Sequence, residues 1–307
     1  MDHSPPTLVI AGPTASGKSD LAVRVASCVG GEIVGADAFQ IYRGIPILSA
    51  QPDAADLARV PHHLIGEVDP MEAFDVVRYL GLASERIAAI QARGKPAILV
   101  GGTGFYIRAV LRGLAAELPG PQPDLRMRLE RTPLAELVAE LVERDPEAAQ
   151  SVDLRNPRRV IRALEVCLVT GLPFTSFRRP VDPVAVPVVR GIWIGMPREL
   201  LHARIEGRTR ALFERGVVDE MRGMGGFLGP TAEQAIGVRE LRAHLGGQLT
   251  VSEAIQKILE ATRQYARRQE TWFRKETGLL RVAPEDAFEA ALGMVRGAGF
   301  EPATSCV

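Results

Sequence analysis

The feature that most constrains this chain of 307 residues is a glycine-rich segment, GPTASGKS, at residues 12–19. It matches the phosphate-loop pattern G-x-x-x-x-G-K-[ST]. An apolar run at 7–11 precedes it, and apolar residues at helical spacing follow it. Strand, loop and helix in this order predict that backbone N–H groups and Lys18 bind phosphate oxygens, and that Ser19 holds a magnesium ion. A plain glycine turn that caps a helix is the alternative.

The rest of the chain alternates strand-like and helix-like stretches. This alternation predicts an α/β fold with a parallel sheet. Strands are expected at 32–37, 96–104 and 190–196, and helices at 73–93, 198–222 and 251–276, the last opened by a capping box of Thr250 with Glu253.

The residue composition of the sequence changes near residue 113. A proline- and glycine-rich stretch is followed by a charged helical stretch, 124–171, that contains no strand-like run. A second proline-rich stretch then leads back to a strand. We therefore expect a P-loop NTPase-like parallel sheet core formed by 1–113 and 190–307, with an inserted all-helical subdomain at 114–189.

The N-terminal segment predicts the location of the protein. It has an acidic residue at position 2 and an apolar run of five residues, which is too short for a signal peptide or a membrane span. We expect a cytoplasmic protein with no membrane partner.

A candidate catalytic acid lies at the end of the second strand. In ordinary P-loop NTPases the magnesium ion is also held by an aspartate that ends a hydrophobic strand. Here the strand at 97–100 ends in Gly-Gly-Thr-Gly, so that acid is missing. Asp37, which ends EIVGAD, would face the phosphate loop at the same edge of the sheet. The alternative is a structural role in a turn or helix cap.

Nearly the whole chain resembles the tRNA dimethylallyltransferases, also called tRNA isopentenyltransferases. The resemblance rests on six sequence blocks that occur in the family's order and spacing. They are GPTASGKS at 12–19, DAFQIYRG at 37–44, PHHLI at 61–65, VGGTGFYI at 100–107, NPRRVIRALEV at 156–166 and TRQYARRQETWFR at 262–274.

This resemblance implies transfer of a dimethylallyl group from dimethylallyl diphosphate to the exocyclic amine (N6) of the adenosine 3′ of the tRNA anticodon, with release of diphosphate. Asp37 would accept the amine proton as general base, and Thr103 would orient the amine. Mg²⁺ is the implied cofactor, with Ser19 as its ligand, and we expect a monomer. The implied diphosphate site comprises Gly12, Pro13, Thr14, Ala15, Ser16, Gly17, Lys18, Ser19 and Arg208.

The resemblance also implies a tRNA-binding surface, and the charge distribution agrees. Residues 151–307 hold 23 basic and 18 acidic side chains, and three arginines lie within five residues at 158–162, at the head of a helix. The alternative for such arginines is a solvated helix surface. The implied RNA contacts are Asp37, Ala38, Phe39, Gln40, Thr103, Arg126, Arg158, Arg159, Val160, Ile161, Arg162, Arg263 and Arg267.

The sequence departs from the family pattern at a few positions. Ala38 replaces a serine, Gln51 a lysine and Val238 a tyrosine. None of these three positions lies in the phosphate loop or the arginine block, and none is the general base. We therefore expect the departures to alter the preference for RNA substrates more than the catalysed reaction.

Three other functions compete with the transferase. They are a P-loop small-molecule kinase, an isopentenyltransferase acting on free adenine nucleotides, and a nucleotide-switched RNA-binding protein. The missing strand-end acid argues against the kinase. The arginine-rich insertion argues against the kinase and also against an isopentenyltransferase that acts on free adenine nucleotides. An RNA-binding switch would have no use for Asp37 at the phosphate site.

Overall fold

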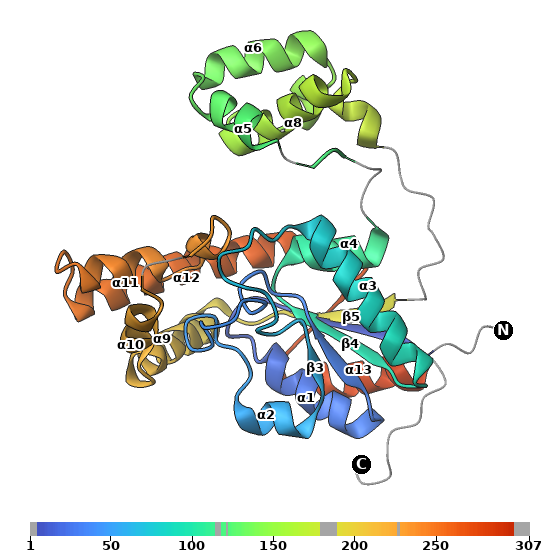
Figure 1. The fold of residues 1–307 in the computed structure, drawn as a ribbon. Coiled ribbons are helices and arrows are strands. Elements are labelled where there is room, and N and C mark those ends of the chain that lie inside the picture. Colours follow the sequence, from blue (N-terminus) through green and yellow to red (C-terminus); the bar gives the residue numbers. More distant parts are fainter. Residues whose placement is uncertain (1–4, 114–117, 121, 179–188, 226–227, 298–307) are drawn as a thin grey trace. The chain divides into compact units, whose positions relative to one another are not determined.

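The computed structural model describes residues 5–113, 118–120, 122–178, 189–225 and 228–297. The chain divides into two compact units (Figure 1). The first, Met1–Leu111 with Ala185–Val307, is here called the core unit, and the second, Arg112–Val184, the helical unit. In the part of the chain that the structure describes, no helix has both the length and the apolar character needed to cross a membrane.

The core unit is built on a parallel sheet of six strands in the order β3-β2-β4-β1-β5-β6. Because the strands are parallel, the segments that follow β1, β2 and β4 meet at one edge of the sheet. The strands are β1 (Thr7–Ala11), β2 (Glu32–Gly35), β3 (His62–His63), β4 (Ala97–Gly101), β5 (Val189–Ile194) and β6 (Leu280–Val282).

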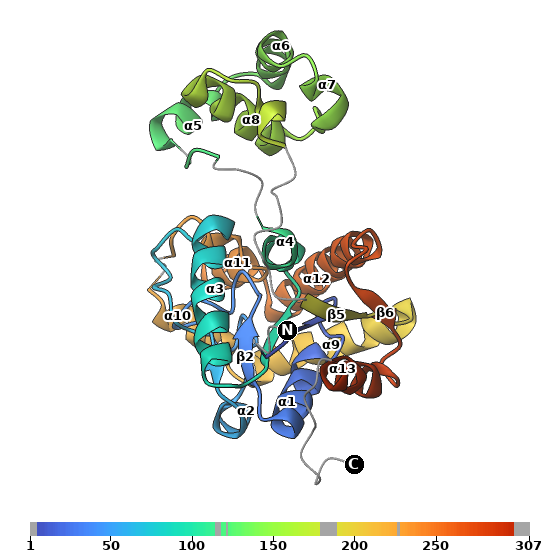
Figure 2. The same ribbon diagram turned by 90° about the vertical axis from the view of Figure 1, so that its right-hand side faces the viewer.

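Helices cover both faces of this sheet (Figure 2). Leu8 and Ile10 pack in a cluster with α1 and α13, whereas Val9 and Ala11 pack on the opposite face, in a cluster with α3, α4 and α12. Strands buried on both faces need continuous apolar runs, as TLVIA and AILVG provide. The helices of this unit are α1 (Lys18–Val29), α2 (Ala54–Arg59), α3 (Val76–Ala92), α4 (Gly104–Arg112), α9 (Arg198–Glu214), α10 (Val217–Gly223), α11 (Val238–Leu245), α12 (Val251–Arg274) and α13 (Ala287–Arg296), with a 3₁₀ turn at Ala232–Gln234.

The helical unit packs around its own apolar core, which includes Leu137, Leu141, Val160 and Leu164. Its longest helix begins with Asn156 as N-cap, whose side chain accepts the Arg158 N–H at 3.2 Å. The described elements are α5 (Pro123–Glu130), α6 (Leu134–Arg144), α7 (Ala148–Ser151), α8 (Pro157–Thr170) and a 3₁₀ turn at Phe174–Arg178.

The structure confirms the predicted fold class and corrects element boundaries. The helix expected at 198–222 is two helices, because Gly216 adopts a φ of 88° between α9 and α10. The strand expected at 32–37 ends at Gly35. The capping box of Thr250 and Glu253 is present, with both of its hydrogen bonds.

A buried carboxylate ties the strands together at the other end of the sheet. Glu32, the first residue of β2, is 4% exposed and pairs with His63 at 2.8 Å, Arg93 at 2.6 Å and Lys95 at 3.0 Å. Burial alone would raise the pKa of the Glu32 carboxyl, but hydrogen bonds from these three partners outweigh it and lower the pKa to about 2.

We expect Glu32→Gln to lower the free energy of unfolding at neutral pH by about 1–3 kcal/mol, because it leaves Arg93 and Lys95 without their shared anion and His63 without its hydrogen-bond partner. The folded-state pKa lies below the ordinary value of 4.5, so the stabilisation is present above pH 4.5 and is lost as pH falls toward 2. Denaturant unfolding at several pH values measures both effects. Glu85→Gln, on an exposed side chain, is the control. Equal acid sensitivity of Glu32→Gln and the wild type would contradict this prediction.

Candidate active site

The phosphate loop connects β1 to α1 in a tight, locally determined shape. Ala15 and Gly17 adopt positive φ angles of 63° and 86°, and the Ser16 N–H donates to the Pro13 carbonyl at 3.2 Å. The Lys18 ammonium turns back over the loop and donates to the same carbonyl at 3.4 Å. The loop and its lysine therefore form one compact turn.

Two partly buried cations converge on this loop. Burial lowers the pKa of Lys18 to about 8, while the negative charge of Asp37 opposes the shift and the charge of Arg208 adds to it. Burial also lowers the pKa of Arg208, whose Nη1 donates to the Thr14 hydroxyl at 2.9 Å. A bound anion would stabilise the charged forms of both side chains and so compensate for their loss of contact with water.

The same loop contains an unsatisfied hydroxyl. The Ser16 Oγ is buried and has no hydrogen-bond partner among the described residues. Buried polar atoms in folded proteins nearly always have a partner. The phosphate loop thus offers a donor as well as positive charge to a ligand.

Asp37 lies two residues beyond the end of β2, at the same edge of the sheet. Its Oδ1 accepts the N–H groups of Phe39 at 2.9 Å and Gln40 at 3.3 Å. The turn that the sequence offered as an alternative role is therefore present, and the carboxylate also lines the cavity described below. One turn both orients the acid and exposes it to the site.

Thr103 is tied to this turn from the neighbouring strand end. Its hydroxyl accepts the Ala38 N–H at 3.0 Å, and its own N–H donates to the Ala36 carbonyl at 3.2 Å. The glycine turn after β4 and the acid after β2 therefore form a single unit, in which Thr103 contacts the Asp37 turn.

The strand-end acid of ordinary P-loop NTPases has no room in this sheet. A Cβ atom at Gly101, the last residue of β4, would lie 2.0 Å from the Ala36 carbonyl oxygen. Any side chain there would displace the backbone that leads to Asp37. The close approach of β4 to the Asp37 turn thus requires the glycine and excludes an aspartate at this position.

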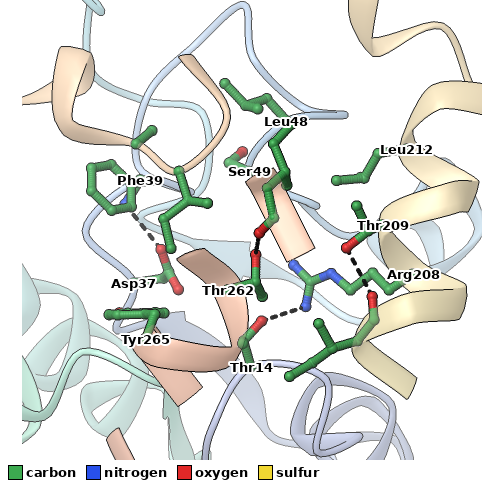
Figure 3. A pocket seen from close by; sticks show the side chains of 14 residues that line it. Thr14, Asp37, Phe39, Leu48, Ser49, Arg208, Thr209, Leu212, Thr262 and Tyr265 are labelled. Carbon is green, nitrogen blue, oxygen red and sulfur yellow. Dashed lines mark hydrogen bonds between the residues drawn. The ribbon is translucent and has the colours of Figure 1, made fainter. Parts of the chain in front are cut away.

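A cavity of about 80 Å³ is lined by Thr14 of the phosphate loop, Asp37 and Arg208, whereas Ser16, Lys18 and Thr103 are not part of its lining (Figure 3). One water needs about 10–15 Å³ of such volume, so the cavity has room for roughly five to eight atoms of that size. Polar side chains line it at Thr14, Asp37, Ser49, Arg208, Thr209, Thr262 and Tyr265, and apolar side chains at Phe39, Leu48, Ile205, Leu212, Ala235, Ile236 and Ile258.

Sequence reasoning missed Gln269 of α12. This side chain is 5% exposed, its Oε1 accepts the Thr14 N–H at 2.9 Å, and its Nε2 donates to the Gly102 carbonyl at 2.8 Å. It therefore links the phosphate loop to the glycine turn before Thr103. The only signal in the sequence was its place within the block TRQYARRQETWFR, where nothing distinguished it from its neighbours.

Tyr265 of α12, which the sequence suggested as part of an apolar stripe, lines the cavity instead. Burial and the charge of Asp37 raise the pKa of its phenol, so it stays neutral. It is the second site residue whose role became apparent only from the fold.

The arginines of α12 have separate environments. Arg263 pairs with Glu206 at 3.5 Å, and Arg274 pairs with Glu270 at 3.3 Å. Arg267 is exposed. Of the two RNA contacts expected on this helix, Arg267 is thus the more accessible.

In the helical unit, two of the expected RNA contacts bind a buried carboxylate. Glu165, with 0% of its side chain exposed, pairs with Arg126 at 2.6 Å and with Arg162 at 2.8 Å. Arg162 also donates to the Pro119 carbonyl at 2.8 Å. Both arginines therefore have a structural role, because removing either would leave this buried charge poorly compensated.

Val160 and Ile161 do not present side chains to solvent, which corrects the expectation that they contact RNA. They are 0% and 7% exposed and belong to the apolar core of the helical unit. Helical periodicity explains this, because residues two and three positions after Arg158 turn toward the core.

Arg158 and Arg159 are exposed at the first turn of α8. The Arg159 side chain is 66% exposed, with only a 4.0 Å pairing to Asp153. Cations at a helix N-terminus oppose the helix dipole, so this position does not favour stability. The N-terminus of α8 does favour a bound anion, because the helix dipole and the two arginines would both attract it.

Fold and site together define a P-loop-like protein in which the phosphate loop, two cations and the Asp37 carboxylate lie at one edge of the sheet. A family model described as IPP transferase matches residues 40–276, and one described as isopentenyl transferase matches residues 6–66. The chain therefore belongs to the IPP transferase family.

A tRNA dimethylallyltransferase of Myxococcus xanthus is 45% identical over 292 residues, which cover 92% of this chain and 94% of the relative. One of Thermus thermophilus is 44% identical, with 93% and 95% covered.

Solved structures are similar as well. A full-length tRNA isopentenylpyrophosphate transferase from Bacillus halodurans is 33% identical, has a TM-score of 0.70, and is matched over 95% of this chain and 96% of its own. A eukaryotic dimethylallyltransferase acting on tRNA is 26% identical with a TM-score of 0.79, over 92% and 74%. The family resemblance inferred from the six sequence blocks is confirmed.

Proposed function

We propose that this protein transfers the dimethylallyl group of dimethylallyl diphosphate to N6 of the adenosine 3′ of the anticodon in tRNA and releases diphosphate. The observation that carries the proposal is one small cavity with Asp37, Thr14 of the phosphate loop and Arg208 in its lining. This arrangement supports a reaction in which a diphosphate leaves while a proton is removed nearby.

The side chains account for both halves of the reaction. As the allylic carbon–oxygen bond breaks, negative charge develops on the diphosphate, where Lys18, Arg208 and the loop N–H groups stabilise it. As the new carbon–nitrogen bond forms, the amine loses a proton to the Asp37 carboxylate. Thr103, held beside the Asp37 turn through the Ala38 N–H, orients the amine.

The residues present fit a magnesium ion held together with the diphosphate. The Ser19 hydroxyl is exposed on the first turn of α1, and the described residues contain no group of three or more His, Cys, Asp or Glu that could hold a metal. Mg²⁺ commonly takes one or two protein oxygens and completes its shell with phosphates and water. Bound there, it would offset charge on the leaving diphosphate.

We also propose that the helical unit binds tRNA through Arg158 and Arg159. Changing both to Ala should raise the KM for tRNA, because two phosphate contacts and their released counterions are lost. The slope of log binding constant against log salt should become shallower by roughly 0.7–1 for each contact. Binding measured at several salt concentrations tests this, and the KM for dimethylallyl diphosphate should stay unchanged.

The matched control removes the same charge from the exposed Arg128 and Arg131 of the same unit. Arg162→Ala is a second comparison, which we expect to lower the melting temperature because it uncovers Glu165. An unchanged salt slope with full tRNA affinity in the Arg158 and Arg159 variant would remove this surface from the RNA site.

The rival function is a P-loop small-molecule kinase. To separate the two, the purified protein is incubated with tRNA and either dimethylallyl diphosphate or ATP, and both the nucleosides and the nucleotides are measured. We expect prenylated adenosine with the first donor and no ATP turnover beyond background with the second. Phosphorylated product from ATP, without prenylated tRNA, would favour the kinase.

A further inference from the structure

Leu48 occupies a defined place in the wall of the active-site cavity. Its side chain is 7% exposed and lines the cavity together with apolar residues of α9 and α12. Figure 3 shows Leu48 at the end of the cavity away from Thr14, with Arg208 between them. The phosphate loop and Leu48 thus lie at opposite ends of one space.

The backbone beneath Leu48 is held by hydrogen bonds to two side chains, Glu220 and Gln40. The Glu220 carboxylate of α10 accepts the N–H groups of Ile47 at 2.7 Å and Leu48 at 2.8 Å. The Gln40 amide donates to the carbonyls of Ser49 at 3.3 Å and Ala50 at 2.7 Å. The segment therefore cannot shift freely, so the size of the residue-48 side chain decides how far the cavity extends.

Gly237 makes room for the Leu48 side chain from behind. A Cβ atom at Gly237 would lie 2.8 Å from Leu48 Cδ1, and the φ of 105° at this glycine excludes most other residues. Leu48 is thus packed against main chain on one side and faces the cavity on the other.

The cavity lining contains both polar and apolar side chains. Thr14, Asp37 and Arg208 provide polar groups for a diphosphate and an amine, whereas Leu48, Leu212 and Ile258 provide apolar surface, with the hydroxyls of Ser49, Thr209 and Thr262 among them. A prenyl chain whose diphosphate lies at Thr14 and Arg208 would extend along this apolar surface, and the Leu48 side chain would limit how far it extends.

We propose that Leu48 is the residue that sets the length of the prenyl group this protein accepts. The inference rests on the proposed function, because it concerns the donor of that same reaction. With a longer allylic diphosphate the chemistry is unchanged: the carbon–oxygen bond to diphosphate breaks, the bond to N6 forms, and the amine proton passes to Asp37.

The test compares dimethylallyl diphosphate with geranyl diphosphate, its ten-carbon homologue, as donors to tRNA. In Leu48→Ala, the ratio of kcat/KM for the ten-carbon over the five-carbon donor should rise by about tenfold or more, since a single methylene in an apolar pocket changes selectivity by about 10–200-fold. Mass spectrometry of the nucleosides identifies which prenyl group was attached.

Leu241→Ala is the matched control. Leu241 is 0% exposed, lies in the same apolar cluster as Leu48 and does not line the cavity. It should leave the donor ratio unchanged while costing similar stability in a melting curve. An equal rise of the ratio in both variants would reflect general loosening of the core and would overturn the proposal.

Leu48→Phe provides a second, opposite test if Leu48→Ala does not fold. A larger side chain should raise the KM for dimethylallyl diphosphate and leave the KM for tRNA unchanged. A folded Leu48 variant with an unaltered donor ratio and unaltered KM overturns the role of Leu48. Absence of prenylated tRNA with the wild-type protein would instead refute the proposed function, so the two failures are distinguishable.

Discussion

Asp37→Asn should lower the turnover of tRNA by about 10²–10⁴-fold, the contribution typical of a positioned general base. The substitution keeps a carbonyl oxygen that can accept the N–H groups of Phe39 and Gln40, so the turn and the cavity should persist. Only the ability to take a proton is removed. Single-turnover kinetics with saturating dimethylallyl diphosphate and tRNA measure the effect.

The control for this prediction is substrate binding by the same variant. Affinity for dimethylallyl diphosphate and the melting temperature should both stay close to those of the wild type. Turnover like that of the wild type in Asp37→Asn would mean that another group accepts the amine proton.

Lys18→Met should weaken binding of dimethylallyl diphosphate by about 10–100-fold, because hydrogen bonds to charged groups contribute about 1.5–3 kcal/mol. Methionine preserves much of the side-chain volume and removes the charge. Titration calorimetry of the diphosphate, with tRNA binding measured separately, should show a loss confined to the diphosphate. Collapse of tRNA affinity with unchanged diphosphate binding would mean that the loop is not the leaving-group site.

Because Lys18 must be protonated to attract the diphosphate, we expect the affinity for dimethylallyl diphosphate to depend on pH. Its pKa of about 8 in the free protein lies below the ordinary value of 10.5, and a bound diphosphate would stabilise the ammonium form. Affinity should therefore be nearly constant just below pH 8 and fall by about tenfold for each pH unit above it. Lys18→Met should lack this slope, and Lys257→Met, on an exposed face of α12, should retain it.

The sequence predicted the parts of the fold that depend on local pattern. The phosphate loop fixes a strand, a turn and a helix within some twenty residues, and continuous apolar runs predict strands buried on both faces. The break at Gly216 was not predicted, because apolar residues on both sides of it keep a helical spacing and only the positive φ separates α9 from α10.

The site residues that could be predicted are those that a local sequence motif and their own functional group identify. Asp37 and Lys18 follow from strand-end position and motif. Gln269 and Leu48 do not, because their roles arise from contacts across more than a hundred residues of chain, such as Thr14 with Gln269 and Leu48 with Gly237. For Val160 and Ile161, proximity to arginines in the sequence was misleading, since a helix turns adjacent residues to different faces.

The most direct test of the proposed function is mass spectrometry of tRNA nucleosides. tRNA is isolated from cells with and without this gene, digested, and analysed for N6-dimethylallyl adenosine and its derivatives. We predict that the modified nucleoside disappears when the gene is removed and returns with the wild-type gene but not with Asp37→Asn. Full retention of the modification in cells without the gene would contradict the proposed function.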